Sequence, residues 1–182
     1  MRYIAVFIII LMSSSISTAQ SISWDSDRKL EWKDFQGPVD PSSRFHALTQ
    51  SGVKYSYRWQ SSGHRTSYTF EVTAYYDKSI SWLKPGKATS ALLAHEQLHF
   101  DISELYARIL KKTFANATFT RRHESEIKQL FAANQIAREE MQVQYDNDTN
   151  HMSNTEQQLK WERYIANALE EITSYSALEV KN

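Results

Sequence analysis

The sequence predicts an α+β fold in which a small N-terminal antiparallel β-sheet is followed by three long α-helices. Apolar and polar residues alternate in segments of the first half of the chain, as in half-buried strands. From about residue 90 onward, apolar residues recur three and four positions apart, as on one face of a helix. Because the strands come first and the helices after, without alternation, the sheet is expected to be antiparallel.

The first residues are predicted to be a signal peptide rather than part of the fold. Arg2 supplies a positive charge, and residues 4–12 form an apolar run that is too short to span a bilayer. Small residues before and at Ala19 fit cleavage after that position. We therefore expect a signal peptide over residues 1–19, a single domain over residues 20–182, and an exported protein, periplasmic or extracellular. An uncleaved anchor is the alternative.

Composition excludes several classes of function. The chain has no cysteine, so it has no disulfide, no cysteine for a lipid anchor and no thiolate ligand for zinc. It carries 21 basic and 21 acidic residues and no long basic run, which gives nucleic-acid binding no electrostatic support. No second apolar run is long enough for a membrane helix, so no stable membrane anchor is expected after cleavage.

The sheet is expected to consist of a first strand and a β-hairpin. Residues 21–34 indicate a first strand with its turn, and Gly-Pro and Asp-Pro pairs break the chain after it. Alternation over residues 47–59 and 66–76, on either side of a Ser-Ser-Gly turn, predicts the hairpin. The second of these strands could offer its edge to an extended peptide, or could be ordinary sheet.

Three helices are expected to follow. Thr89 or Ser90 can cap the first, which should run to about residue 114. Two more are predicted over residues 121–145 and 155–174, with Thr155 as the cap of the last and a polar loop over 146–154.

The first helix contains His95-Glu96-x-x-His99. Positions four apart lie on one face of a helix, so His95 and His99 can hold one metal ion, with Glu96 placed to take a proton from an attacking water. The alternative is a surface helix with two solvated histidines. The segment around the motif is apolar on nearly all sides, so we expect a buried helix. Burying three polar side chains costs free energy unless they have a partner, and a bound metal ion would be such a partner.

A catalytic zinc site usually has three protein ligands, so one more is needed. His151 lies in the polar loop between the second and third helices, which could fold back over the first helix. Glu104 follows His99 by five residues, about 140° round a continuous helix. Other candidates are Asp101, His123, Glu139 and Glu140. The residues alone leave the choice open.

Several segments together resemble a bacterial family of predicted secreted zinc-dependent proteases, catalogued largely as a domain of unknown function. The matching segments are Leu30-x-Trp32-x-Asp34-Phe35-x-Gly37, Ala47-x-Thr49, Leu93-x-His95-Glu96-Gln97-x-His99-Phe100-Asp101-Ile102 with Glu104, Ala107 and Arg108, and Tyr145-Asp146-x-x-Thr149-x-His151 with Asn154, Gln158 and Trp161. The resemblance implies a metal-dependent hydrolase with His151 as third ligand and Glu104 as runner-up. The family usually has Gly after this His, where the present chain has Met152.

The predicted function is that of a secreted zinc metalloprotease. His95, His99 and His151 would bind Zn²⁺, Glu96 would act as general base, and a protein or peptide would be the substrate. Tyr145 could act as a second hydrogen-bond donor to the substrate oxyanion. Two alternatives use the same motif, namely a non-catalytic exported zinc-binding scaffold and a zinc amidase that acts on peptidoglycan.

Overall fold

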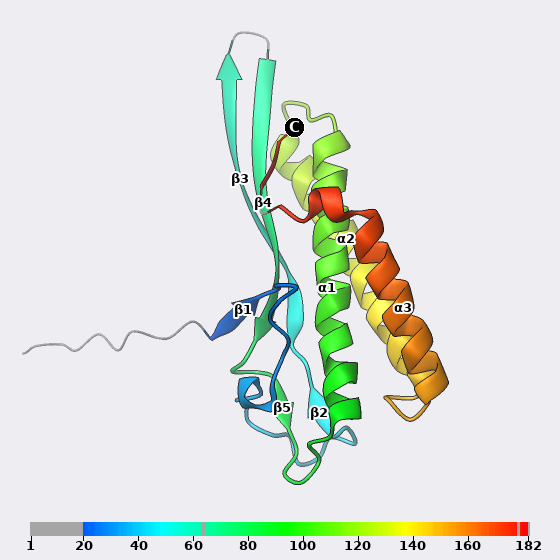
Figure 1. The fold of residues 1–182 in the computed structure, drawn as a ribbon. Helices are drawn as coiled ribbons and strands as arrows, with labels where there is room; N and C mark the ends of the chain where they lie inside the picture. Colours follow the sequence, from blue (N-terminus) through cyan, green and yellow to red (C-terminus); the bar gives the residue numbers. More distant parts are fainter. Residues whose placement is uncertain (1–19, 63–64, 178, 182) are drawn as a thin grey trace, which may run out of the picture.

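The computed structural model describes residues 20–62, 65–177 and 179–181 (Figure 1). The predicted signal peptide, residues 1–19, lies outside this range. Within the described residues, no helix combines the length and the apolar character needed to cross a membrane.

The sheet is built on one long hairpin. Strand β3 pairs with β4 in an unbroken antiparallel register from Ser51 opposite Tyr76 to Ser62 opposite Arg65. The short strands β1 and β6 pair with the other edge of β4, and β2 pairs with β5 in a separate two-stranded sheet. The elements are β1 (Ser21–Ser23), η1 (Trp32–Asp34), β2 (Ala47–Leu48), β3 (Ser51–Ser62), β4 (Arg65–Asp77), β5 (Trp82–Leu83) and β6 (Glu179–Lys181).

Three helices follow, so the predicted α+β order is confirmed. They are α1 (Ser90–Asn116), α2 (His123–Thr149) and α3 (Thr155–Glu171), with a short 3-10 helix η2 (Thr173–Tyr175) after them. Helix α1 runs along the hairpin, while α2 and α3 pack on its opposite side (Figure 1). Helix α1 therefore lies in the middle of the molecule, between the sheet and the other two helices.

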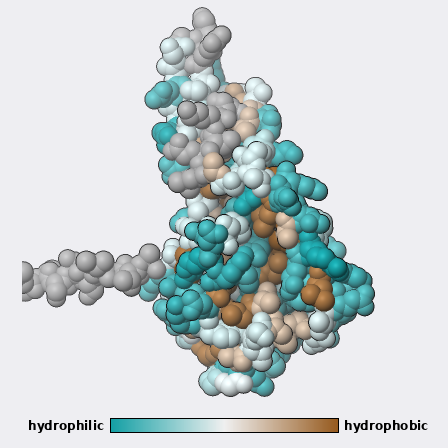
Figure 2. Space-filling model, in the orientation of Figure 1, coloured by the Kyte–Doolittle hydropathy of each residue, from teal (hydrophilic) through white to brown (hydrophobic). Residues whose placement is uncertain are grey.

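The core lies between β4 and α1. Phe70, Val72, Ala74 and Tyr76 alternate along β4 and are fully buried, as the alternation in the sequence predicts. Two rings of α1 pack on these residues, Phe114 on Phe70 and Phe100 on Tyr76. On the face shown in Figure 2, brown surface gathers over the packed body, and the described part of the hairpin end is mostly teal and pale.

Three features differ from expectation. Helix α2 continues to Thr149, four residues beyond its expected end, so the first part of the expected loop is helical. Strand β6, which the sequence analysis did not include, pairs with β4 over Thr69–Glu71. Because β4 is also paired with β1 and β3, it lies inside the sheet, and its edge is not the peptide-binding edge that we considered.

Candidate metal centre

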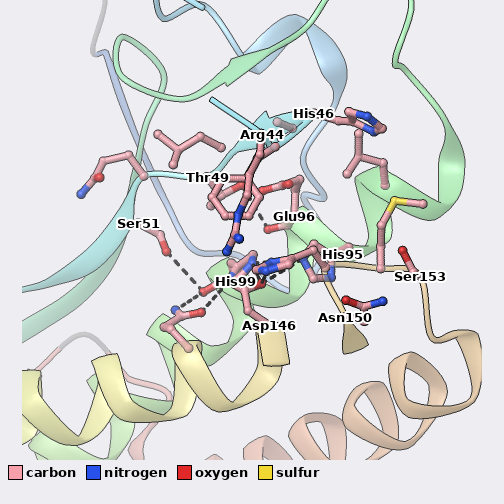
Figure 3. A pocket seen from close by; sticks show the side chains of 18 of the residues that line it. Arg44, His46, Thr49, Ser51, His95, Glu96, His99, Asp146, Asn150 and Ser153 are labelled. Atoms are coloured by element: carbon pink, nitrogen blue, oxygen red, sulfur yellow. Dashed lines mark hydrogen bonds and ion pairs between the residues drawn. The ribbon is translucent and has the colours of Figure 1, made fainter. Parts of the chain in front are cut away.

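Three side chains from two helices converge at one point (Figure 3). Nε2 of His95 and Nε2 of His99, both on α1, lie 3.3 Å apart. Oδ1 of Asp146, on α2, lies 3.2 Å from each of these nitrogens. The three ligand atoms therefore form a nearly equilateral triangle.

Local sequence explains why the triangle forms. The Thr89 side chain accepts a hydrogen bond from the Leu92 backbone and fixes the start of α1. From there, helical periodicity brings His95 and His99 to the same face. On α2, the buried Tyr145 stacks on the His95 ring with centroids 4.7 Å apart, which holds the next residue, Asp146, beside the histidines.

Two glutamines set the orientation of the imidazole rings. The Nε2 of Gln142 donates to the His99 backbone oxygen, so its Oε1 faces Nδ1 of His99, 2.5 Å away. The Nε2 of Gln158 donates to Glu162, so its Oε1 faces Nδ1 of His95, 3.2 Å away. An amide oxygen only accepts, so both Nδ1 atoms must carry hydrogen. In the neutral rings the two Nε2 lone pairs then point at Asp146.

The residues fit a metal ion. Two imidazole lone pairs and a carboxylate oxygen meet here, and this set of acceptors could hold a cation at its centre. Zinc–nitrogen bonds of 2.0–2.1 Å in a tetrahedron place neighbouring ligand atoms about 3.3–3.4 Å apart. The observed edges of 3.2 and 3.3 Å match that spacing. Imidazole and carboxylate are also the ligand types that remain for zinc in a chain without cysteine.

Electrostatics around the cluster keep Asp146 ionised. Burial alone would raise the pKa of the Asp146 carboxyl, but hydrogen bonds from His95 and His99, which form when their rings are protonated on Nε2 as well, hold it well below its ordinary range. Burial would likewise lower the pKa of His99, but the carboxylates of Asp146 and Glu96 outweigh it and raise that pKa. The site therefore favours positive charge at its centre, whether a proton or a metal ion supplies it.

Glu96 is buried, lies outside the group of three ligand atoms, and lines the same cavity. The cavity has a volume of about 540 Å³ and is bounded by α1, by α2 with its following loop, and by the segment that carries Thr49. The Thr49 hydroxyl donates to the Glu96 backbone oxygen at 3.3 Å, which ties this segment to α1. Figure 3 shows the Glu96 side chain on this side of the helix.

His151, the predicted third ligand, lies close to the cluster without joining it. It lines the cavity, and its Nδ1 is 3.6 Å from Oδ1 of Asp146. Among the described residues, however, the group whose ligand atoms all lie within 4.8 Å of one another is His95, His99 and Asp146. The loop that carries His151 lines the same cavity as α1, and the ring of His151 packs on Phe45, with centroids 4.7 Å apart.

Two other candidates lie elsewhere. The buried carboxylate of Glu104 accepts from Nε of Arg108 at 2.8 Å and does not line the cavity. The Tyr145 hydroxyl, considered as a donor to the substrate, points away from the cavity and donates to Gln158 Oε1 at 2.8 Å. Burial raises the pKa of Tyr145, so its hydroxyl stays protonated and can donate to the Gln158 oxygen.

Sequence reasoning missed Asp146 and the two glutamines. Asp146 and Gln158 both stand in segments that carry the family resemblance, so a signal existed for them. Asp146 was expected in the polar loop and was not considered as a ligand, whereas α2 continues through it. Nothing in the sequence singled out Gln142.

The fold and the cluster define an α+β protein with a partly buried His-His-Asp group that could hold a metal ion. The chain belongs to the family described as "Bacterial protein of unknown function (DUF922)", which matches residues 23–152. The matched range contains the three converging residues, Glu96 and His151. No curated protein matches the chain. No solved structure matches it either.

Proposed function

We propose that the protein is a zinc-dependent hydrolase that cleaves peptide bonds, with His95, His99 and Asp146 as the metal ligands. The observation that carries this proposal is the triangle of ligand atoms with edges of 3.2 and 3.3 Å, beside a buried carboxylate in a cavity. When bound, zinc supplies the chemistry of a Lewis acid, which lowers the pKa of water and polarises a carbonyl group. Asp146 takes the place that the sequence analysis gave to His151.

Side chains of the protein would carry out proton transfer and hold the ligands in position. The Glu96 carboxylate accepts the proton of the attacking water and delivers it to the nitrogen of the leaving amine. Gln142 and Gln158 keep hydrogen on the Nδ1 atoms of the two histidines, so that both Nε2 atoms stay available. The cavity wall orients the substrate carbonyl against this group.

A strand edge beside the cluster supports a peptide as the substrate. Backbone groups of His46 and Gln50 bond to the segment that contains β5, namely to Lys84, Asp77 and Ser81. Alternate residues of an extended strand point their backbone groups to opposite edges, so those of Ala47 and Thr49 point the other way. Ala47 and Thr49 line the cavity, where an extended peptide could add as a further strand.

The zinc-binding scaffold is favoured less, because a structural zinc site is closed by a fourth protein ligand. Among the described residues, three side chains provide ligand atoms that lie within 4.8 Å of one another. Three is the number of protein ligands usual for a catalytic zinc site, which keeps one position for water or substrate.

The test is the substitution Glu96→Gln in protein loaded with zinc. Cleavage is followed by mass spectrometry on a mixture of peptides of randomised sequence. We expect the parent protein to cleave peptides in this mixture, and Glu96→Gln to bind zinc equally well with at least a hundredfold lower cleavage rate. Full activity of Glu96→Gln would exclude Glu96 as the base, and a zinc-loaded parent that cleaves no peptide would overturn the proposal.

A further inference from the structure

One guanidinium in the cavity has no acidic partner. Arg44 lines the cavity, and Figure 3 shows its side chain reaching from its own segment towards His95 and His99. In the part of the chain that the structure describes, Arg44 makes no ion pair. Its guanidinium stacks on the adjacent ring of Phe45, with Cζ 4.9 Å from the centroid.

The stacking orders Arg44. The Phe45 ring, on which the guanidinium lies, packs in turn on the ring of His151 with centroids 4.7 Å apart. Arg44, Phe45 and His151 thus form a row that bridges the two walls of the cavity. Because Arg44 makes no ion pair among the described residues, its N–H groups are available to a planar, two-oxygen anion.

The other charges of the cavity leave this cation uncompensated. Asp146 is assigned to the metal and Glu96 to proton transfer. The other acidic group of the lining, Glu139, lies 3.3 Å from the guanidinium of Arg138, through its Oε2 and the Arg Nη2. Arg44 is exposed to solvent and lines the cavity, so its guanidinium is open to an anion carried by the ligand.

We propose that Arg44 recognises a carboxylate of the substrate, so that the enzyme prefers peptides with a carboxylate next to the bond that is cleaved. The inference rests on the proposed function, because the ligand is taken to be a peptide. A peptide has two sources of this group, its C-terminal carboxylate and an acidic side chain. Either would be bound by paired N–H···O bonds from one guanidinium.

The experiment measures binding separately from cleavage, in zinc-loaded Glu96→Gln protein. Four mixtures of acetylated pentapeptides are offered together, and the retained peptides are quantified by mass spectrometry. Two mixtures lack acidic residues and differ in ending as a free acid or as an amide. The other two end as amides and contain one Glu or one Gln. A preference in the first pair identifies the C-terminal carboxylate, and one in the second pair identifies an acidic side chain.

We expect about tenfold enrichment of at least one carboxylate form over its neutral twin, as for one charge-assisted pair. Adding Arg44→Ala should abolish the enrichment, and Arg44→Lys should keep part of it. Arg163→Ala, which removes an exposed arginine of α3, should leave it unchanged. Zinc content and circular dichroism establish that the Arg44→Ala protein is folded and loaded.

Two results would overturn the inference: no preference for either carboxylate form, or an equal preference with and without Arg44. The proposed function can fail separately. If the parent protein cleaves no peptide while the Arg44-dependent enrichment persists, the hydrolase proposal is wrong and carboxylate recognition stands. If the parent cleaves acidic and neutral peptides equally and binding shows no preference, the hydrolase proposal stands and carboxylate recognition by Arg44 is wrong.

Discussion

Oε1 of Gln142 lies 2.5 Å from Nδ1 of His99, and the same amide donates to the backbone oxygen of His99 at 2.9 Å. Both ends of the amide are thus fixed by one residue of α1. Gln158, from α3, holds His95 through the corresponding contact. The ring orientations of a pair on α1 therefore depend on the packing of α2 and α3.

This dependence predicts that Gln142→Leu weakens metal binding although Gln142 touches no metal. Without the acceptor, the His99 ring can rotate or move its hydrogen to Nε2, and the affinity for zinc should fall about 10–100-fold. A competition titration with a chelator measures it. Gln144→Leu, at an exposed position of the same helix, is the matched control and should bind zinc normally. Equal affinities in the two variants would show that Gln142 does not position His99.

The third ligand can be decided between Asp146 and His151. We expect Asp146→Asn to lose most of its zinc after dialysis, because it removes the negative charge 3.2 Å from both Nε2 atoms. His151→Ala should keep most of its zinc. Elemental analysis of both proteins is the measurement. Zinc loss in His151→Ala alone would restore the ligand set expected from the sequence.

The third ligand predicted from the sequence, His151, differs from the one that the structure favours, Asp146, for a physical reason. Periodicity identified β3, β4 and all three helices, and it placed His95 and His99 on one face of a buried helix. It could not identify the third side chain, because the contact between α1 and α2 is tertiary. The expected end of α2 at Tyr145 then turned a helical Asp146 into a loop residue. Apolar spacing fades in the polar last turn of α2, so periodicity does not indicate that the helix continues.

We expect the protein to become more stable against unfolding when Met152 is replaced by glycine. Asn150, His151 and Met152 have φ values of +47°, +49° and +75°, in the left-handed region that favours glycine. Met152 stands where the family resemblance expects Gly. Met152→Gly should raise the free energy of unfolding by about 0.5–1 kcal/mol, measured by urea denaturation. Ser153→Gly, at the next position without a positive φ, should give no gain; a less stable Met152→Gly protein would contradict the strain.

Gly37 lies in the first segment of the family resemblance. We expect any larger residue at this position to clash with its neighbours and to lower the stability of the fold. A Cβ at this position would lie 2.6 Å from the backbone carbon and oxygen of Ile80, which cannot move independently. Gly37→Ala should therefore cost about 1–3 kcal/mol of unfolding free energy or more. Gly86→Ala is the comparison, because a Cβ there meets nothing within 4 Å and suffers only from its φ of +74°. Urea denaturation of both variants should show the larger loss at Gly37.

We expect Asp34 to account for part of the loss of folding stability at low pH. Its carboxylate is fully buried, 3.0 Å from both Nη2 of Arg28 and the Glu31 backbone nitrogen. Burial alone would raise the pKa of Asp34, but these partners and Lys78 lower it below the ordinary 3.8. A lowered pKa in the folded state contributes stability that is present above the unfolded pKa and lost as pH falls below it.

The measurement for Asp34 is the free energy of unfolding in urea at pH 7 and at pH 3. The parent protein should lose stability between these values. Asp34→Asn should be less stable at pH 7 and should show a smaller loss on acidification, because the amide does not titrate. Asp27→Asn, which changes an exposed carboxylate of the preceding turn, should keep the acid slope of the parent. An unchanged slope in Asp34→Asn would mean that other carboxylates, such as Asp146, carry the acid response.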